Sequence, residues 1–221
     1  MRAGVRRRAS TCVAAVGIAA AVFAAQSAEA AEPAAAFAHS PATPGSDQGD
    51  LALVAADALA HLTLFVRTDT LPELWKYEAH RTAVAKGIGE RLSIEPERLL
   101  NAWARAGLSH QLALMAALSQ LGTPYAKNAS TPGVGFDCSG LTSYAWAVAG
   151  TGLARNSAAQ IRAAEPRTAE TASAGDLVQY PGHIMMYLGV DRAIVHAIEP
   201  GRPVEVDVFA ERRQVAFGSP I

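Results

Sequence analysis

Gly135-Phe136-Asp137-Cys138-Ser139-Gly140-Leu141 is the stretch of this 221-residue chain from which the rest can be interpreted. Apolar residues then recur with the spacing of one helical face, at Leu141, Tyr144, Ala145 and Val148. Gly150 follows as a stop signal, so the sequence predicts a helix that begins close to Cys138. At a helix N-terminus, with a histidine nearby, a thiol pKa of about 8.5 falls to roughly 3.5–7.5. Cys138 is therefore a candidate nucleophile, and a buried structural cysteine is the alternative.

Residues 1–30 have the features of a secretory signal peptide. A basic start is followed by an apolar stretch over residues 12–25 and by the small-residue pattern Ala28-Glu29-Ala30. We expect an exported protein, secreted or held in the cell wall or periplasm, with no stable membrane insertion after cleavage. Cleavage removes Cys12 and leaves Cys138 without a disulfide partner in its own chain. A lone exported thiol favours the catalytic interpretation.

The charge balance narrows the range of partners. The leader takes four arginines and one glutamate with it, so the net charge changes from −1 to −4. A mildly acidic protein gives no electrostatic reason to expect nucleic acid or an anionic membrane as a partner. The sequence has no phosphate-cradling glycine loop and no metal-ligand cluster with recognised spacing, so we expect no cofactor and no metal.

The chain changes in composition along its length. Residues 31–49 are rich in Ala, Pro, Ser and Gly, as a disordered linker would be. Residues 50–106 form a predicted helical extension, with helices over 50–66, 73–92 and 96–106, and Pro96 suits a first helical position. Another helix is predicted from a Ser109 cap to Leu121. These four predicted helices carry no recognised chemical motif.

The segment 107–221 is the predicted catalytic domain. Beyond Pro166, short runs rich in Val, Ile, Met and Tyr are separated by turn residues. The predicted strands cover 176–180, 183–188, 193–198 and 204–209. Links this short imply an antiparallel sheet, and helices followed by strands imply an α+β fold.

Two of the six histidines could work with the cysteine. The other four, placed in the linker or on partly exposed helix faces, are His39, His61, His80 and His110. His183 opens a strand, and His196 lies in an otherwise apolar strand. Either one alone would be read as a core histidine bonded to a backbone carbonyl. Together they suggest that Cys138 attacks, His183 moves the proton and His196 orients the ring of His183.

From about Leu114 to Val206 the chain resembles the NlpC-like family of papain-like bacterial cell-wall cysteine peptidases. Six ordered motifs carry the resemblance: Gly122-Thr123-Pro124-Tyr125, Gly135 to Leu141, Arg155-Asn156-Ser157, Gly175-Asp176-Leu177-Val178, His183 to Gly189, and Val195-His196-Ala197. The resemblance implies a papain-like fold in which helices pack on a central antiparallel sheet. The helical extension lies outside the recognised part.

The resemblance also implies an activity and roles for particular residues. Members of the family hydrolyse peptidoglycan stem peptides, typically between D-isoglutamate and a diamino acid. Cys138 would be the nucleophile, His183 the general base and acid, and His196 the orienting residue. Tyr125 would line the pocket. Asp137 and Ser139 would receive the free amine of a trimmed stem peptide, and Asp137 would also suit a helix cap.

Several alternatives stay open. Lys127-Asn128-Ala129 replaces the common Trp-Gly-Gly of the family, and Met185 replaces a common glycine, so its bulk either narrows the cleft or packs elsewhere. An N-acetylmuramoyl-L-alanine amidase or an acyltransferase could use the same fold, and so could a non-catalytic wall-binding module. The helical extension is either an inhibitory segment or a scaffold that enlarges the core.

Overall fold

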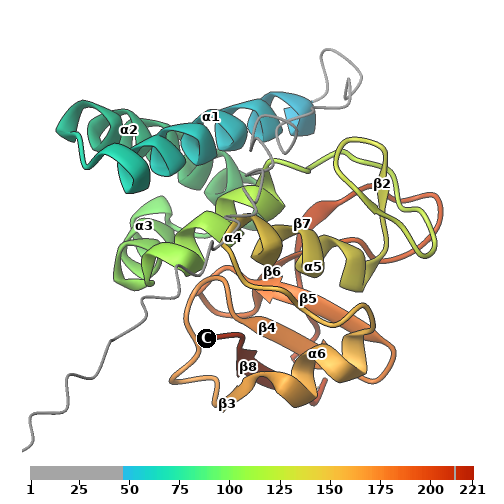
Figure 1. Ribbon diagram of the computed structural model, residues 1–221. Helices are drawn as coiled ribbons and strands as arrows, with labels where there is room; N and C mark the ends of the chain where they lie inside the picture. The colour runs from blue at the N-terminus through green and yellow to red at the C-terminus, as the bar shows by residue number, and fades with distance from the viewer. Residues whose placement is uncertain (1–46, 212) are drawn as a thin grey trace, which may run out of the picture. The chain divides into compact units, whose positions relative to one another are not determined.

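The computed structural model describes residues 47–211 and 213–221 (Figure 1). The predicted signal peptide, its Cys12, and His39 lie outside this part, as does the linker up to residue 46. Helix α1 (Asp47–Thr68) begins three residues inside the segment predicted to be linker, so that boundary was wrong. Nothing in the spacing of Asp47, Gln48 and Gly49 predicts a helix start, because the apolar stripe begins only at Leu51.

The N-terminal helices agree closely with the periodicity of the sequence. After α1 come α2 (Leu71–Leu92), α3 (Pro96–Arg105) and α4 (Leu108–Leu118). Pro96 occupies the first turn of α3, as predicted. The cap predicted at Ser109 was wrong, because α4 begins at Leu108 and its N-cap is Gly107, two residues before Ser109. Only Ala106 and Gly107 separate α3 from α4, and the Gly107 carbonyl already accepts the Gln111 N–H at 3.0 Å.

The sheet is antiparallel throughout, and the α+β class is confirmed. Its six strands among the described residues lie in the order β3-β8-β4-β5-β6-β7. The strands are β3 (Glu165–Arg167), β4 (Leu177–Tyr180), β5 (His183–Tyr187), β6 (Ala193–His196), β7 (Glu205–Val208) and β8 (Ala216–Ser219). Four were predicted. Strands β3 and β8 were not predicted, because they are short and contain Pro166 and Gly218, which are unfavourable in strands.

Two further helices and a small hairpin complete the fold. Strands β1 (Ser130–Thr131) and β2 (Gly135–Phe136) pair directly before α5 (Cys138–Val148). Helix α6 (Ser157–Ala163) follows, capped by the Asn156 side chain. Helix α5 packs on β5 and on α4, so it lies between the helical layer and the sheet (Figure 1).

Strand β5 separates two apolar clusters. Ile184 and Met186 belong to the main core, whereas Met185 and Tyr187 belong to a smaller cluster. Because side chains alternate along a strand, His183 lies on the same face as Met185. Met185 is buried in the smaller cluster, so packing accounts for its bulk.

The helical extension shares the main core with the rest of the domain. Leu59 of α1, Ile88 of α2 and Trp103 of α3 belong to the same buried cluster as residues of α5 and the sheet. Polar contacts also cross the boundary: Tyr77 Oη donates to Gln111 Oε1 at 2.7 Å, and Trp103 Nε1 donates to the Leu188 carbonyl at 2.8 Å. A scaffold that enlarges the core fits these contacts.

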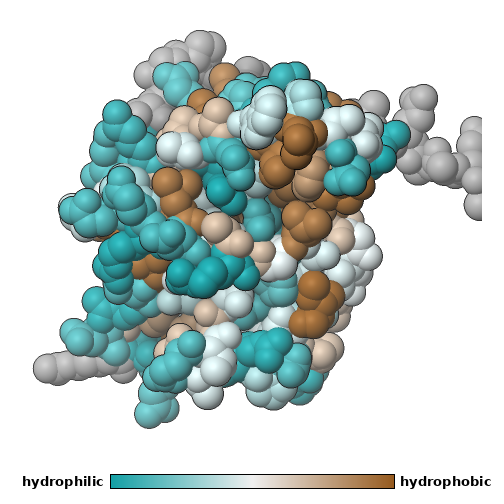
Figure 2. Space-filling view, turned by 90° about the vertical axis from the view of Figure 1, so that its left-hand side faces the viewer, coloured by the Kyte–Doolittle hydropathy of each residue, from teal (hydrophilic) through white to brown (hydrophobic). Residues whose placement is uncertain are grey.

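Helix α1 is also the one described helix that is long and apolar enough to cross a membrane, over Gly49–Thr68 with a mean hydropathy of 1.5. Core helices of soluble proteins meet the same test, and α1 packs on α2 and α4. Apolar side chains remain exposed around the α1–α2 turn: Leu64, Val66, Leu71 and Trp75. Figure 2 shows apolar patches in the upper part of the face that includes this turn.

Candidate active site

The start of α5 presents the cysteine. Asp137 is the N-cap, and its Oδ1 accepts a hydrogen bond from the Gly140 backbone N–H at 2.7 Å. Cys138 is the first residue of the helix and is a free, partly exposed thiol. The predicted helix start and the predicted capping role of Asp137 are both confirmed. Gly150, with a φ of +86°, lies just beyond the other end of the helix.

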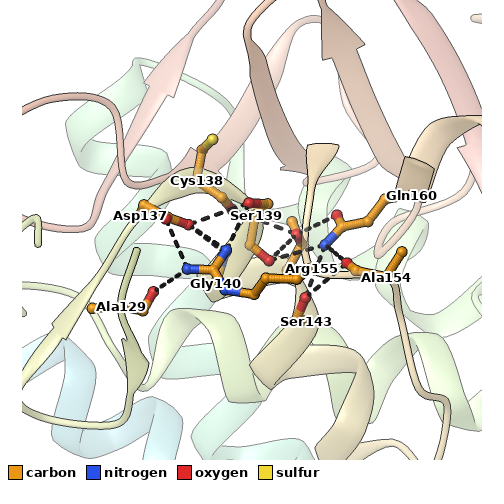
Figure 3. A network of polar contacts seen from close by, with 10 residues as sticks. Ala129, Asp137, Cys138, Ser139, Gly140, Ser143, Ala154, Arg155 and Gln160 are labelled. Carbon is orange, nitrogen blue, oxygen red and sulfur yellow. Dashed lines mark hydrogen bonds and ion pairs between the residues drawn. The ribbon is translucent and has the colours of Figure 1, made fainter. Parts of the chain in front are cut away.

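Arg155 closes a polar network around this helix start. Its guanidinium donates to both carboxylate oxygens of Asp137, at 2.9 and 2.7 Å, and to Ser139 Oγ at 2.9 Å (Figure 3). Burial alone would raise the pKa of Asp137, but Arg155, the Gly140 N–H and Ser139 together lower it. The Cys138 sulfur points away from this network (Figure 3). The network therefore holds the helix start while leaving the thiol available.

Gln160 connects helix α6 to the start of α5 by hydrogen bonds. Its Nε2 donates to the Ser139 carbonyl at 2.9 Å and to the Ala154 carbonyl at 2.8 Å, and its Oε1 accepts from Thr142 at 2.7 Å. Gln160 is almost fully buried. We call Asp137, Ser139, Arg155 and Gln160 the cap network. Neither Arg155 nor Gln160 has a role that could be predicted from the sequence.

Gly140 is required by a close backbone approach. A Cβ atom at this position would lie 2.0 Å from the Ala129 carbonyl oxygen. The same carbonyl accepts from the Asp137 N–H at 3.1 Å and from Arg155 at 3.2 Å. The loop residue Ala129, which stands where the family commonly has glycine, therefore takes part in the support of the helix start.

His183 and His196 are in direct contact. His183 opens β5 and His196 ends β6, and His183 Nε2 lies 3.0 Å from His196 Nδ1. Both rings are buried. We call these two residues the histidine pair. The Nε2 atom of His183 is engaged with His196, so Nδ1 is the nitrogen of His183 left for another partner.

The histidine pair is neutral at pH 7. Burial lowers the pKa of His183 to about 4, and the positive fields of His196 and Arg213 act in the same direction. Burial likewise lowers the pKa of His196 to about 4, against an opposing effect of Asp207. A neutral ring has a lone pair that can accept a proton.

A ladder of backbone hydrogen bonds joins the segment that leads to Cys138 to the segment that leads into β7. The Phe136 N–H donates to the Pro124 carbonyl at 3.2 Å, and the Tyr125 N–H donates to the Arg202 carbonyl at 3.0 Å. Strand β7 pairs with β6, which ends at His196. Residues 122–126 therefore form the link between the cysteine side and the histidine side of the site.

Tyr125 lies within the electrostatic reach of the cysteine. Burial raises the pKa of Tyr125, and negative charge on Asp137 or Cys138 raises it further. Tyr125 consequently keeps its phenolic proton at neutral pH and can donate it in a hydrogen bond.

A pocket of about 150 Å³ adjoins His196 on the face of the sheet that carries Met185. Its lining includes Tyr180, Asp207, Phe209 and Arg213. The Arg213 guanidinium stacks 3.9 Å from the centre of the Tyr180 ring. This face therefore combines an apolar floor with one exposed cation.

The predicted site residues fall into two groups. The structure brings His183 and His196 together and places Asp137 and Ser139 beside Cys138. Among the hydrogen bonds of the described residues, none joins the Cys138 thiol to either imidazole, so their pairing belongs to the proposal below. Asp137 and Ser139 are buried and already bound by Arg155, so neither side chain is free to receive an amine without rearrangement.

His110 was wrongly placed on a partly exposed helix face. It is buried, with Nε2 3.0 Å from Asp176 Oδ1 and 3.1 Å from Ser219 Oγ. These contacts connect α4 to the start of β4 and to β8. The motif residue Asp176 therefore has a structural partner. By contrast, His61 and His80 are partly exposed, as expected, and stack on each other.

Comparison with known proteins assigns the domain. Residues 122–213 match the sequence profile of the NlpC/P60 family. A probable endopeptidase of Mycobacterium tuberculosis and one of Corynebacterium glutamicum are each 36% identical over 104 residues, which is 46% of this chain. A bifunctional muramidase/DL-endopeptidase of Bacillus subtilis is 36% identical over 91 residues. The chain therefore contains a domain of the NlpC/P60 family, and the resemblance seen in the sequence is confirmed.

The match covers part of each relative. The aligned region is 26% of the Mycobacterium protein, 49% of the Corynebacterium protein and 28% of the Bacillus protein. Among solved structures, the P60 domain of a Mycobacterium avium subspecies paratuberculosis antigen is 26% identical, with a TM-score of 0.46 over 51% of this chain and 95% of that one. RipD of Mycobacterium tuberculosis, described as a non-catalytic NlpC/p60 domain protein, is 24% identical with a TM-score of 0.44 over 51% of this chain and 98% of that one.

Proposed function

We propose that this protein is an exported cysteine peptidase that hydrolyses peptidoglycan stem peptides. The single observation that carries the proposal is the 3.0 Å contact between His183 Nε2 and His196 Nδ1, in a domain whose helix α5 begins at a free cysteine. This contact leaves His183 Nδ1 as a base for the thiol. The relatives named as endopeptidases support the same reaction class.

The proposed reaction begins with a neutral Cys138 thiol and a neutral His183 ring. The pKa of His183, at about 4, leaves the ring uncharged at pH 7, so it takes the thiol proton as the sulfur attacks the peptide carbonyl. An imidazolium therefore forms during proton transfer and does not stabilise a resting thiolate. The first N–H groups of α5, which have no helical acceptor, and the Tyr125 phenol suit the developing oxyanion.

The later steps return the proton. His183 gives it to the leaving amine, the C–N bond breaks, and an acyl group remains on Cys138. Water, deprotonated by the same ring, then attacks the thioester and releases the thiol. The bond that fits the family resemblance lies between D-isoglutamate and a diamino acid. Asp137 and Ser139 would approach the free amine of such a substrate only if Arg155 shifts.

Defined muropeptides test the proposal. The chain from Ala31 onward and its Cys138→Ala variant are incubated with purified muropeptides, and the products are identified by mass spectrometry. Cleavage inside the stem by the first protein alone is the expected result. His80→Asn is a matched control that removes a histidine of α2 that contacts His61 and Lys76, and it is expected to retain activity.

The other functions give different products. Release of the whole stem from the lactyl group would identify an amidase, and transfer to an added amine would identify an acyltransferase. Binding to peptidoglycan without any product, combined with an inert thiol, would identify a non-catalytic wall-binding module. Each of these results would overturn the endopeptidase proposal.

A further inference from the structure

Two buried polar atoms face each other behind the histidine pair. Among the described side chains, His196 Nε2 and Glu205 Oε1 are buried without a hydrogen-bond partner, and they lie 3.8 Å apart. A buried donor or acceptor without a partner costs about 1–3 kcal/mol. Closing the gap would give His196 Nε2 a hydrogen-bond partner and would add a hydrogen bond to the ion pair that Glu205 Oε1 makes with Arg202.

The sheet register holds these two groups opposite each other. His196 on β6 pairs directly with Glu205 on β7, so the two side chains project from the same face. Both are shielded, with side-chain exposures of 4% and 15%. A shift of roughly 1 Å between the two side chains would bring the 3.8 Å gap to hydrogen-bond length.

Arg202 supplies the counter-charge. Its Nη2 lies 2.7 Å from Glu205 Oε1, as an ion pair that lacks the direction of a hydrogen bond. Its backbone carbonyl accepts the Tyr125 N–H. Arg202 therefore stabilises a negative charge on Glu205 and connects this corner to the Tyr125 segment.

The Glu205 carboxylate favours one of two tautomeric states of the histidine pair. One proton lies between His183 Nε2 and His196 Nδ1, and it belongs to one ring or to the other. If His196 Nδ1 held it, the neutral His196 would turn a lone pair toward Glu205, and His183 would carry its own proton at Nδ1. Such a His183 could not accept the proton of the thiol.

The other arrangement satisfies every group. A proton on His196 Nε2 faces the Glu205 carboxylate, His196 Nδ1 accepts from His183 Nε2–H, and His183 Nδ1 keeps its lone pair. We propose that Glu205, supported by Arg202, is a positioning residue that selects this tautomer and so makes His183 a competent base. This inference rests on the proposed function for its catalytic consequence, but the tautomers themselves can be measured independently.

Asp207 provides a matched comparison. Its Oδ2 lies 4.0 Å from the same His196 nitrogen, but its side chain is 46% exposed. Water can hydrate that carboxylate, so it selects a tautomer less strongly. Asp207→Asn therefore removes a similar charge at a similar distance without removing the buried partner.

Nitrogen NMR of the histidine rings tests the proposal. In the Cys138→Ala protein labelled with 15N-histidine at pH 7, we expect His183 and His196 both to be protonated at Nε2. Glu205→Gln and Glu205→Leu should produce mixed tautomers, and Asp207→Asn should not. Tautomers that are unchanged in Glu205→Gln, or Nδ1-protonated rings in the parent protein, would overturn the proposal.

Kinetics supply the second readout. With Cys138 intact, Glu205→Gln should lower kcat about 10–100-fold with KM within about twofold, Glu205→Asp should recover part of the loss, and Asp207→Asn should stay within about twofold. Equal kcat values for Glu205→Gln and the parent would count against the proposal. If no muropeptide is cut by any form, the proposed function fails, and the NMR result still decides the role of Glu205.

Discussion

The cap network and the histidine pair are built differently. In the cap network, the buried polar atoms of Asp137, Ser139 and Gln160 all have partners. Behind the histidine pair, His196 Nε2 has no hydrogen-bond partner among the described residues, and Glu205 Oε1 is held by an ion pair with Arg202 but by no hydrogen bond. The first cluster therefore fixes geometry, and the second retains the freedom to move a proton. Mutations should separate these roles, with losses of stability on one side and losses of rate on the other.

We expect the largest effect from His183→Gln, which should lower the rate without unfolding the protein. Removal of the base should lower kcat by about 10³-fold or more, because proton transfer and the correct tautomer are lost together. The folded state should persist, since a glutamine keeps a polar group beside His196. Steady-state hydrolysis and thermal unfolding measure the two quantities. A tenfold loss or less would show that another group is the base.

The pH dependence of stability is the next largest effect. The pKa of both rings is lowered from 6.5 to about 4, so the unfolded chain binds more protons than the folded one between these values. Stability should therefore be constant above about pH 6.5 and fall by a few kcal/mol toward pH 4. Chemical denaturation at several pH values measures this fall. His196→Asn should flatten the curve, and an unchanged slope would contradict the burial argument.

Gly140→Ala tests the cap network sterically. The added Cβ would meet the Ala129 carbonyl oxygen, so we expect a loss of about 1–3 kcal/mol, although alanine ordinarily favours a helix. Gly152→Ala is the control, because nothing lies within 4 Å of its Cβ position. Urea denaturation of both variants measures the change in the free energy of unfolding. Equal stability would mean that the loop at Ala129 moves freely.

Arg155→Met should have a smaller effect. Its side chain is 45% exposed, so water replaces part of the lost ion pair and we expect about 1–2 kcal/mol. The effect should shrink in an Asp137→Asn background, because the two residues act on one contact. Arg167→Met, which breaks an exposed pair with Glu165, should cost less than about 1 kcal/mol. Additive losses at Arg155 and Asp137 would contradict the network.

The sequence was informative wherever a local pattern determines the structure. Helical periodicity located α2 and α3, Asp137 was recognised as a cap, and short runs rich in Val, Ile, Met and Tyr located β4 to β7. The contacts that complete the site are non-local. Arg155 reaches Asp137 across 18 residues, and His110 reaches Ser219 across 109. No spacing rule connects such residues, which is why Arg155, Gln160 and Glu205 received no role and His110 was placed on the surface.

The helix boundaries show a similar limit. Ser109 is a good capping residue, but α4 begins before it, and the first helical hydrogen bond runs from the Gln111 N–H to the Gly107 carbonyl. Likewise, β8 contains Gly218, whose Cβ position is closely approached by Ala164 and Ile161. The close packing at this position requires glycine. Because glycine has a low strand propensity, β8 could not be predicted from the sequence.

The central claim is that the Cys138 thiol and the histidine pair act as one chemical unit. The rate of Cys138 alkylation by iodoacetamide at pH 7, followed by intact mass in the parent protein and in His183→Gln, tests it without any substrate. Because neutral His183 takes the thiol proton as the sulfur attacks, we predict alkylation at least about tenfold faster than that of a free thiol, falling to the free-thiol rate in His183→Gln. Equal rates in the two proteins would contradict the claim.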